Sequence, residues 1–298
     1  MYRGMVLSVT ASCLFAGQYY LAALVPDMSG GEVFGWRTMI AFPFVTVFLV
    51  ASGEWKAVSE IINRIKNQPL LLPGLILSSL LMTVQQWLFI WAPLNGHGLN
   101  VSLGYFLLPL VMLTAGCLLY RDRLSGIKKL AALSAAVGVG HELYQASGFS
   151  WEALTVSLGM TAYFILRKTL RTENLGGFWF DMAFMIPVAL WFILSAGKPG
   201  HFMVHRSSDY FMVALIGIIS AGAFMSYITA SRHLSFSLFG LMGYVEPVLL
   251  VIVSLLLGEM IKAEEWLTYL PIWAAVALLI CDGILVLIRN KAEQKRDR

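Results

Sequence analysis

The segment GEVFGWRTMIAFP, residues 31–43, has a counterpart in the second half of the chain, LGGFWFDMAFMIP, residues 175–187. The two align without a gap, and the alignment pairs Arg37 with Asp181, aromatic residues with aromatic residues, and a proline with a proline. Each segment lies in an apolar run long enough to cross a bilayer as a helix. This internal similarity predicts a chain built from two related halves.

The composition indicates an integral membrane protein. Of 298 residues, 58% are hydrophobic and 13% are charged, and the mean hydropathy is +0.75, more than one soluble core can absorb. The first apolar run is longer than the core of a typical secretory signal, so we take it as a span. The expected spans are 4–25, 31–52, 70–92, 100–120, 129–146, 152–169, 177–196, 210–231, 236–258 and 266–289.

Lysine and arginine residues predict how these ten spans are oriented. With the N-terminus in the cytoplasm, only Lys198, Arg206 and Lys262 fall on the opposite side. This asymmetry is what the positive-inside rule requires, and it predicts two cytoplasmic termini in a bacterial-type inner membrane. The basic tail NKAEQKRDR, residues 290–298, is then a topology anchor, so we expect membrane lipid and no nucleic acid as a partner.

Ten spans divide into two sets of five at GFSW, residues 148–151, giving a first repeat over 1–147 and a second over 148–298. Because five is odd, the second set must enter the membrane from the opposite side. A weaker echo joins residues 104–122 to residues 243–259 through Gly-Tyr, a proline and a terminal acid. The expected fold is all-α, with ten transmembrane helices in two inverted repeats around a central cavity, as in secondary transporters.

Longer patterns carry a family resemblance. WLFIWAPLNGHGLNVSLGYFLLPLVML (87–113) and ASRHLSFSLFGLMGYVEP (230–247) resemble the drug/metabolite transporter superfamily, EamA type, and within it the RarD-like permeases. This resemblance implies ten helices around a cavity and movement of small metabolites, amino acids or drugs across the inner membrane. The family usually has Gly-Glu at both helix exits, whereas the first exit here is Arg121-Asp122.

Glu246 lies near the middle of the expected span 236–258, where an ionisable group requires a reason. It could bind a proton or a cation on a cavity wall, since desolvation favours the protonated carboxyl. It could equally be a permanently protonated acid bonded to a neighbouring helix. Pro247 is expected to leave the carbonyl of Gly243 without its usual partner, and a broken helix beside the acid would make a polar niche.

Arg37 and Asp181 each lie about two turns inside a span, and inversion places them toward opposite membrane surfaces. They are therefore not expected to pair with each other. One hypothesis makes them gate residues, one at each mouth. In the alternative, which we favour from the sequence, Arg37 extends outward along its own helix and bonds loop carbonyls.

Further polar and aromatic residues are candidates for the cavity. Ser79, Thr83 and Gln86 form a stripe on one helical face, which in lipid must contact a cavity or another helix. Trp87, beside the stripe, could stack on an amine or an aromatic substrate. By resemblance, the first, third and fourth spans of each half line the cavity. The candidates for substrate binding are therefore Tyr19, Ser79, Thr83, Gln86, Trp87, Tyr105, Tyr163, Tyr227, Tyr244 and Glu246.

The sequence favours a secondary transporter over an enzyme. No metalloprotease, Walker, nucleophile-elbow or Rossmann motif is present, so no cofactor, metal or catalytic residue is expected. We expect alternating-access export of a small amphiphilic metabolite such as an amino acid, with Glu246 carrying a countercharge or a coupled proton. A translocase for a lipid-linked sugar or an amine, and a membrane-embedded enzyme that acts on lipid, stay open as alternatives.

Overall fold

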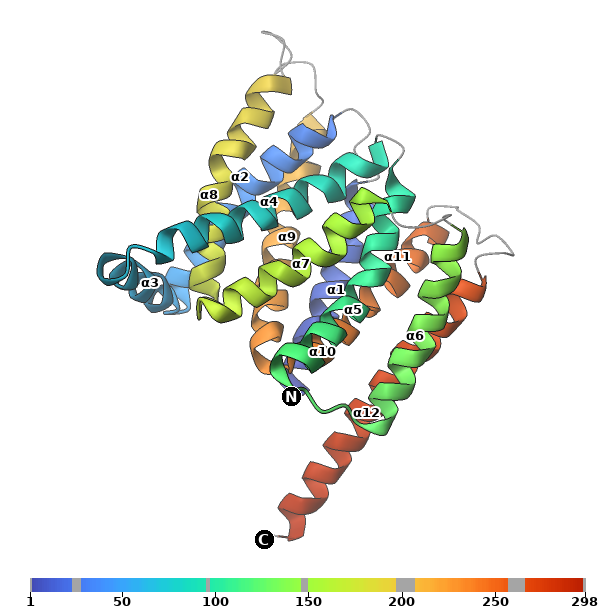
Figure 1. Ribbon diagram of the computed structural model, residues 1–298. Coiled ribbons are helices and arrows are strands. Elements are labelled where there is room, and N and C mark those ends of the chain that lie inside the picture. Colours follow the sequence, from blue (N-terminus) through green and yellow to red (C-terminus); the bar gives the residue numbers. More distant parts are fainter. Residues whose placement is uncertain are drawn as a thin grey trace.

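The computed structural model of the protein describes residues 2–22, 28–94, 97–145, 150–196, 207–256 and 266–296. These residues form helices and short connections, and none of the described ranges contains a strand (Figure 1). The helices are α1 (Tyr2–Ala22), α2 (Gly30–Ala51), α3 (Trp55–Asn67), α4 (Leu71–Leu94), α5 (Gly98–Tyr120), α6 (Gly126–Gln145), α7 (Trp151–Thr169), α8 (Leu175–Ala196), α9 (Ser207–His233), α10 (Phe236–Met242), α11 (Val245–Leu256) and α12 (Trp266–Arg296).

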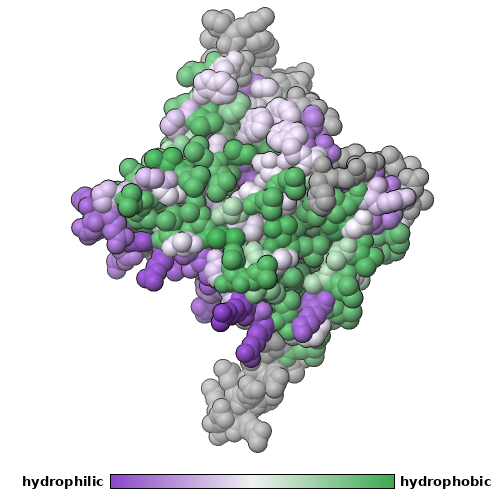
Figure 2. All heavy atoms as spheres, in the orientation of Figure 1, coloured by the Kyte–Doolittle hydropathy of each residue, from purple (hydrophilic) through white to green (hydrophobic). Residues whose placement is uncertain are grey.

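Within the described part of the chain, five helical segments are long and apolar enough to cross a membrane, and two shorter apolar helices accompany them. Figure 2 shows hydrophobic side chains over most of the visible face, which is stable only if lipid covers it. The fold is therefore that of a helical membrane protein, and the count of ten spans stays a prediction. The five segments are Gly30–Ala51, Leu71–Ala92, Leu103–Tyr120, Leu175–Ser195 and Phe211–His233.

Helices from the two halves of the chain pack against one another. α1 lies on α9, α2 on α8, α5 on α7 and α10, and α6 on α12 (Figure 1). Glycines permit the closest of these contacts, since a Cβ at Gly35 would stand 2.8 Å from the carbonyl oxygen of Ala189 and one at Gly138 would stand 2.5 Å from that of Thr268. The α6 and α12 pair forms one edge of the molecule, and α3 lies at the opposite edge.

The expected span 236–258 is broken into α10 and α11 by a turn at Gly243 and Tyr244. The carbonyl of Gly243 accepts a hydrogen bond from the backbone N–H of Glu246 at 3.3 Å. As expected, Pro247 has no N–H for the usual i+4 bond to this carbonyl, and the bond from Glu246 replaces it because the chain turns more tightly there. Pro247 lies in the first turn of α11, where a missing N–H costs little.

A short amphipathic helix, α3, follows α2 and was not among the expected spans. Val58 and Ile61 are buried and the helix packs on α8, whereas Lys56 and Lys66 are exposed. Figure 2 shows hydrophilic side chains around α3 and along the adjacent lower edge of the molecule. Such a helix suits the boundary between lipid and water.

Candidate substrate cavity

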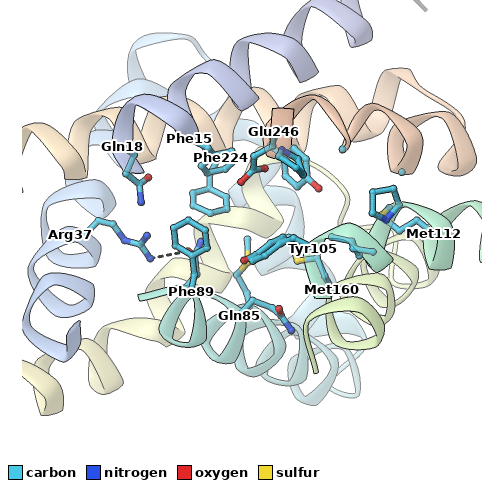
Figure 3. Close-up of a pocket in the computed structure, with 18 residues that line it drawn as sticks. Phe15, Gln18, Arg37, Gln85, Phe89, Tyr105, Met112, Met160, Phe224 and Glu246 are labelled. Atoms are coloured by element: carbon cyan, nitrogen blue, oxygen red, sulfur yellow. Dashed lines mark hydrogen bonds between the residues drawn. The ribbon is translucent and has the colours of Figure 1, made fainter. Parts of the chain in front are cut away.

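A cavity lies between α1, α2, α4, α5, α7, α9 and the break between α10 and α11 (Figure 3). It holds about 770 Å³ of empty space, including space open to solvent, of which the centre of a water molecule can reach about 60 Å³. The cavity is therefore narrow in this conformation. Its lining residues are Phe15, Gln18, Arg37, Met82, Gln85, Gln86, Phe89, Tyr105, Leu108, Pro109, Met112, Met160, Phe224, Tyr227, Gly240, Gly243, Glu246 and Pro247.

Arg37 places a buried cation on the cavity wall. Its side chain is 3% exposed, and Nη2 donates a hydrogen bond of 2.8 Å to Oε1 of Gln86. Among the described residues, no carboxylate lies within ion-pair distance of its guanidinium, which lies 5.9 Å from the ring of Phe34 and also interacts with Tyr105. The expectation that Arg37 extends outward to loop carbonyls was wrong, because Gln86 holds it inside the protein.

Glu246 supplies an acid to the same cavity from the first turn of α11. Its side chain is partly exposed, and it makes no hydrogen bond or ion pair with any residue in the described ranges. Tyr105 and Tyr227 are its electrostatic neighbours, and Tyr105 also interacts with Arg37. A phenol thus stands within the field of both charged groups. Figure 3 shows Arg37 and Glu246 at separate places on the wall.

Aromatic rings and thioethers make up most of the remaining wall. The ring of Phe15 packs edge-on against Phe224, with centroids 4.9 Å apart, and Phe89 packs edge-on against Tyr105 at 5.7 Å. Met82, Met112 and Met160 complete this surface. Such side chains exclude water and adapt to irregular apolar shapes.

The structure brings four of the ten predicted binding residues to the cavity, together with the gate candidate Arg37. The four are Gln86, Tyr105, Tyr227 and Glu246.

The other six predicted residues lie outside the lining of this cavity. Ser79 donates to the carbonyl of Asp181, Thr83 to that of Ser79, and Tyr244 to that of Phe106, at 2.7, 2.7 and 3.1 Å. Trp87 stacks on Trp91 with centroids 5.1 Å apart, Tyr163 donates to the Asp181 carboxylate, and Tyr19 is partly exposed.

Asp181, the second gate candidate, is enclosed in a cluster away from this cavity. It forms an ion pair with Arg167 and accepts hydrogen bonds from Tyr163 at 2.9 Å and from Ser78 at 2.8 Å. Asp181, Arg167, Tyr163 and Ser78 are each at most 1% exposed. Arg167 also donates to the carbonyls of the α7–α8 turn, which fastens that turn to α4 and α8.

Asp122, at the first helix exit, donates its backbone N–H to the carbonyl of Gly116 in its own helix at 3.2 Å, but its side chain bonds to another helix. Its Oδ2 accepts a hydrogen bond of 2.9 Å from the backbone N–H of Ser237, at the start of α10. An acid from the first half of the chain therefore stabilises a helix of the second half. The corresponding acid, Glu259, lies outside the described residues.

The largest miss concerns α4, where the polar stripe pointed to the wrong face. Met82, Gln86 and Phe89 line the cavity at positions i, i+4 and i+7, whereas Ser79 and Thr83 lie on the face that contacts α8. Both stripes include Gln86 and have helical spacing. Of the two, only the mixed polar and apolar stripe faces the cavity, so selecting polar residues alone could not find it.

Comparisons with known proteins agree with this architecture. The chain is 37% identical over 287 residues to an uncharacterized transporter of Haemophilus influenzae, covering 95% of each chain. It is 37% identical over 293 residues to the chloramphenicol-sensitive protein RarD of Pseudomonas aeruginosa, covering 98% of each. A third relative, protein RarD of Salmonella typhimurium, is 26% identical over 285 residues, covering 95% of this chain and 96% of its own.

No family model matches the chain. One solved structure, titled only as the crystal structure of a protein, superposes with a TM-score of 0.62 over 94% of this chain and 98% of its own, at 16% identity, which shows the fold alone. The names of the relatives identify a multi-pass bacterial membrane transporter and not an enzyme. With two relatives at 37% identity over nearly its full length, the chain belongs to the RarD-like permeases of the drug/metabolite transporter superfamily, EamA type.

Proposed function

We propose that the protein is a secondary transporter that exports a small amphiphilic metabolite, such as an amino acid, by alternating access. The observation that carries this proposal is the presence of Arg37 and Glu246 on one cavity, neither with an ionic partner among the described residues. A zwitterion presents a carboxylate and an ammonium group to such a pair. The aromatic and thioether walls would hold its apolar part.

The energetics support a ligand with both charges. A buried charge without a counterion is costly, so a molecule that pairs with Arg37 recovers free energy that the empty cavity lacks. Gln86 satisfies one N–H group of Arg37 with a neutral oxygen and leaves the positive charge uncompensated. Tyr105, which interacts with both charged groups, would lie beside the bound head group.

Alternating access is supported by the helix contacts, which are repeated when each helix of one half is replaced by its counterpart in the other half. Replace α1, α2, α4, α5 and α6 by α7, α8, α9, the α10–α11 pair and α12. The packing of α1 on α9 then becomes that of α7 on α4, and that of α5 on α7 becomes that of α10 and α11 on α1, both of which occur. This symmetry favours two inverted repeats, over 1–147 and 148–298, in an inner membrane with both termini cytoplasmic.

Glu246 is our candidate for coupling transport to protons. It lies in the first turn of α11, beside a break in the helix, where its carboxyl group can bind either a cationic group of the ligand or a proton. The alternative, a permanently protonated structural acid, would need a hydrogen-bond acceptor, and none of the described residues supplies one.

The test is transport in proteoliposomes over a panel of amino acids and related amphiphiles, with and without a pH gradient. Chloramphenicol belongs in the panel because one relative is named for sensitivity to it. We expect Glu246→Gln to abolish the dependence on the pH gradient and Arg37→Gln to weaken uptake of carboxylate-bearing compounds. Glu142→Gln is the matched control, since Glu142 lies on α6 and accepts a hydrogen bond of 2.9 Å from Thr268. Unchanged gradient dependence in Glu246→Gln, in both directions, would exclude the proton role.

A further inference from the structure

A second hollow opens on the outer face of the molecule between α4 and α7, which lie side by side in Figure 1. Leucines form its rim: Leu80 and Leu158 are 51% and 54% exposed. In Figure 2 the surface over these two helices is largely hydrophobic. The groove therefore faces lipid. It is lined by Leu77, Leu80, Leu81, Val84, Gln85, Leu154, Thr155, Leu158 and Gly159.

One residue, Gln85, lines both this groove and the central cavity. Its side chain is 4% exposed, and Nε2 donates a hydrogen bond of 2.8 Å to the backbone carbonyl of Thr155 on α7. Its Oε1 atom is buried and accepts no hydrogen bond from any residue in the described ranges. In Figure 3, Gln85 lies on the side of the cavity opposite Glu246. A single amide thus separates an apolar groove from a cavity that holds charged groups.

Gly159 explains how Gln85 reaches across to α7. A Cβ atom at position 159 would lie 2.5 Å from Nε2 of Gln85, closer than real contacts allow. The missing side chain leaves the space that the amide occupies, so this glycine is required by a close approach. Gln85 separates the groove from the cavity by one neutral hydrogen bond and the van der Waals contact of its side chain. This barrier is weak compared with helix packing.

We propose that the groove is a lateral portal through which an amphiphile dissolved in the bilayer reaches the central cavity, and that Gln85 is its gate. The ligand class follows from the groups met along this route. An apolar groove suits a hydrophobic body, the amide of Gln85 offers a free oxygen, and Arg37 and Glu246 suit a polar head group. This inference rests on the proposed function, because it supplies the entry route to the same cavity.

The test measures access with a thiol reporter in proteoliposomes. The three native cysteines, Cys13, Cys117 and Cys281, are first replaced by alanine. Met112→Cys is the reporter, since Met112 lies on α5, is 1% exposed, and lines the central cavity but not the groove. Two reagents are compared: a maleimide attached to an acyl chain and dissolved in the bilayer, and a charged methanethiosulfonate confined to water.

We expect the bilayer reagent to label the reporter, and Gln85→Ala to accelerate labelling by about tenfold, equivalent to about 1.4 kcal/mol less cost for opening. Gln85→Met, which keeps the length of the side chain and removes the donor, should act in the same direction and covers the case in which Gln85→Ala fails to fold. Leu158→Trp should slow labelling by filling the groove. Leu130→Trp is the matched control, since Leu130 on α6 is also 54% exposed.

If the Gln85 and Leu158 variants were labelled at the same rate as the reporter protein without them, the portal would be overturned. The groove would then be only a binding site for a lipid acyl chain. Labelling by the charged reagent alone, with the Gln85 variants again without effect, would also overturn it, because the cavity would then be served from water. Neither result depends on a transported substrate. The portal and the proposed function can therefore fail separately. Thermal unfolding of each variant serves as the control that it is folded.

Discussion

Arg37 on α2 and Asp181 on α8 occupy aligned positions in the two halves of the chain, yet their surroundings differ. Asp181 has a cation and two hydroxyl donors around its carboxylate. Arg37 has one neutral acceptor, Gln86, and faces a cavity. Of these two aligned ionisable positions, one thus fastens helices together, and the other faces a cavity. The difference predicts opposite responses to removing each charge.

The largest effect is expected at the enclosed position. Asp181→Ala leaves Arg167 buried without an anion, which should lower the free energy of unfolding by about 3–5 kcal/mol. Thermal unfolding of the purified protein in detergent measures this loss. Asp282→Ala is the control, because Asp282 is also buried, at 7% exposed, but pairs with its cation, Lys128, at the longer distance of 3.7 Å. Equal losses at the two sites would contradict a special role for the Asp181 cluster.

A smaller loss is expected from Tyr163→Phe. This change removes the hydroxyl that donates to Asp181 and accepts from Arg167 but leaves their ion pair in place, so the loss should be about 1.5–3 kcal/mol, the contribution of one hydrogen bond to a charged group. Tyr227→Phe is a matched control on the cavity wall, where no hydrogen bond of the phenol to a described residue is found. The contrast between the Asp181 cluster and the cavity wall weakens if both variants unfold at the same temperature.

The link between the halves at Asp122 should contribute less. Asp122→Ala removes the acceptor for the first turn of α10, at a cost of about 1 kcal/mol, as for other helix caps. Hydrogen exchange at the amides of 236–242 should increase, and Asp122→Asn should restore most of the protection because the amide retains an oxygen acceptor. Unchanged exchange in Asp122→Ala would show that Ser235 alone caps this helix.

Arg37→Gln should change stability least, and it could even stabilise the protein, because it removes a desolvated charge without orphaning a counterion. Its effect should instead appear in ligand binding: a lost charged hydrogen bond of about 1.5–3 kcal/mol weakens affinity roughly 10- to 100-fold. Ligand-dependent thermal shifts measure this change, with Arg37→Lys as the charge-retaining comparison. A stability loss as large as that of Tyr163→Phe would make Arg37 a structural residue.

Prediction from sequence succeeded where the signal is local. Apolar runs located most helices, and one acid in a long apolar span singled out Glu246, which lines the cavity. It failed on α4 because a period of 3.6 residues defines which residues share a face, but not which neighbour that face contacts. The expected break beside Glu246 is present, but its form could not be predicted, since a proline can be accommodated by a kink or, as here, by a new helix start.

The sequence by itself determined that the chain is helical and lies in a membrane. Its long apolar segments favour lipid, where the backbone N–H and C=O groups must form hydrogen bonds within the segment, as they do in a helix. Only the tertiary structure decided which ionisable groups are paired. Arg167 and Asp181 meet where a short turn joins α7 to α8, whereas the guanidinium of Arg37 donates its hydrogen bond to the neutral Gln86. Partner choice depends on the rotation and approach of whole helices, which is set by packing across the two halves of the chain.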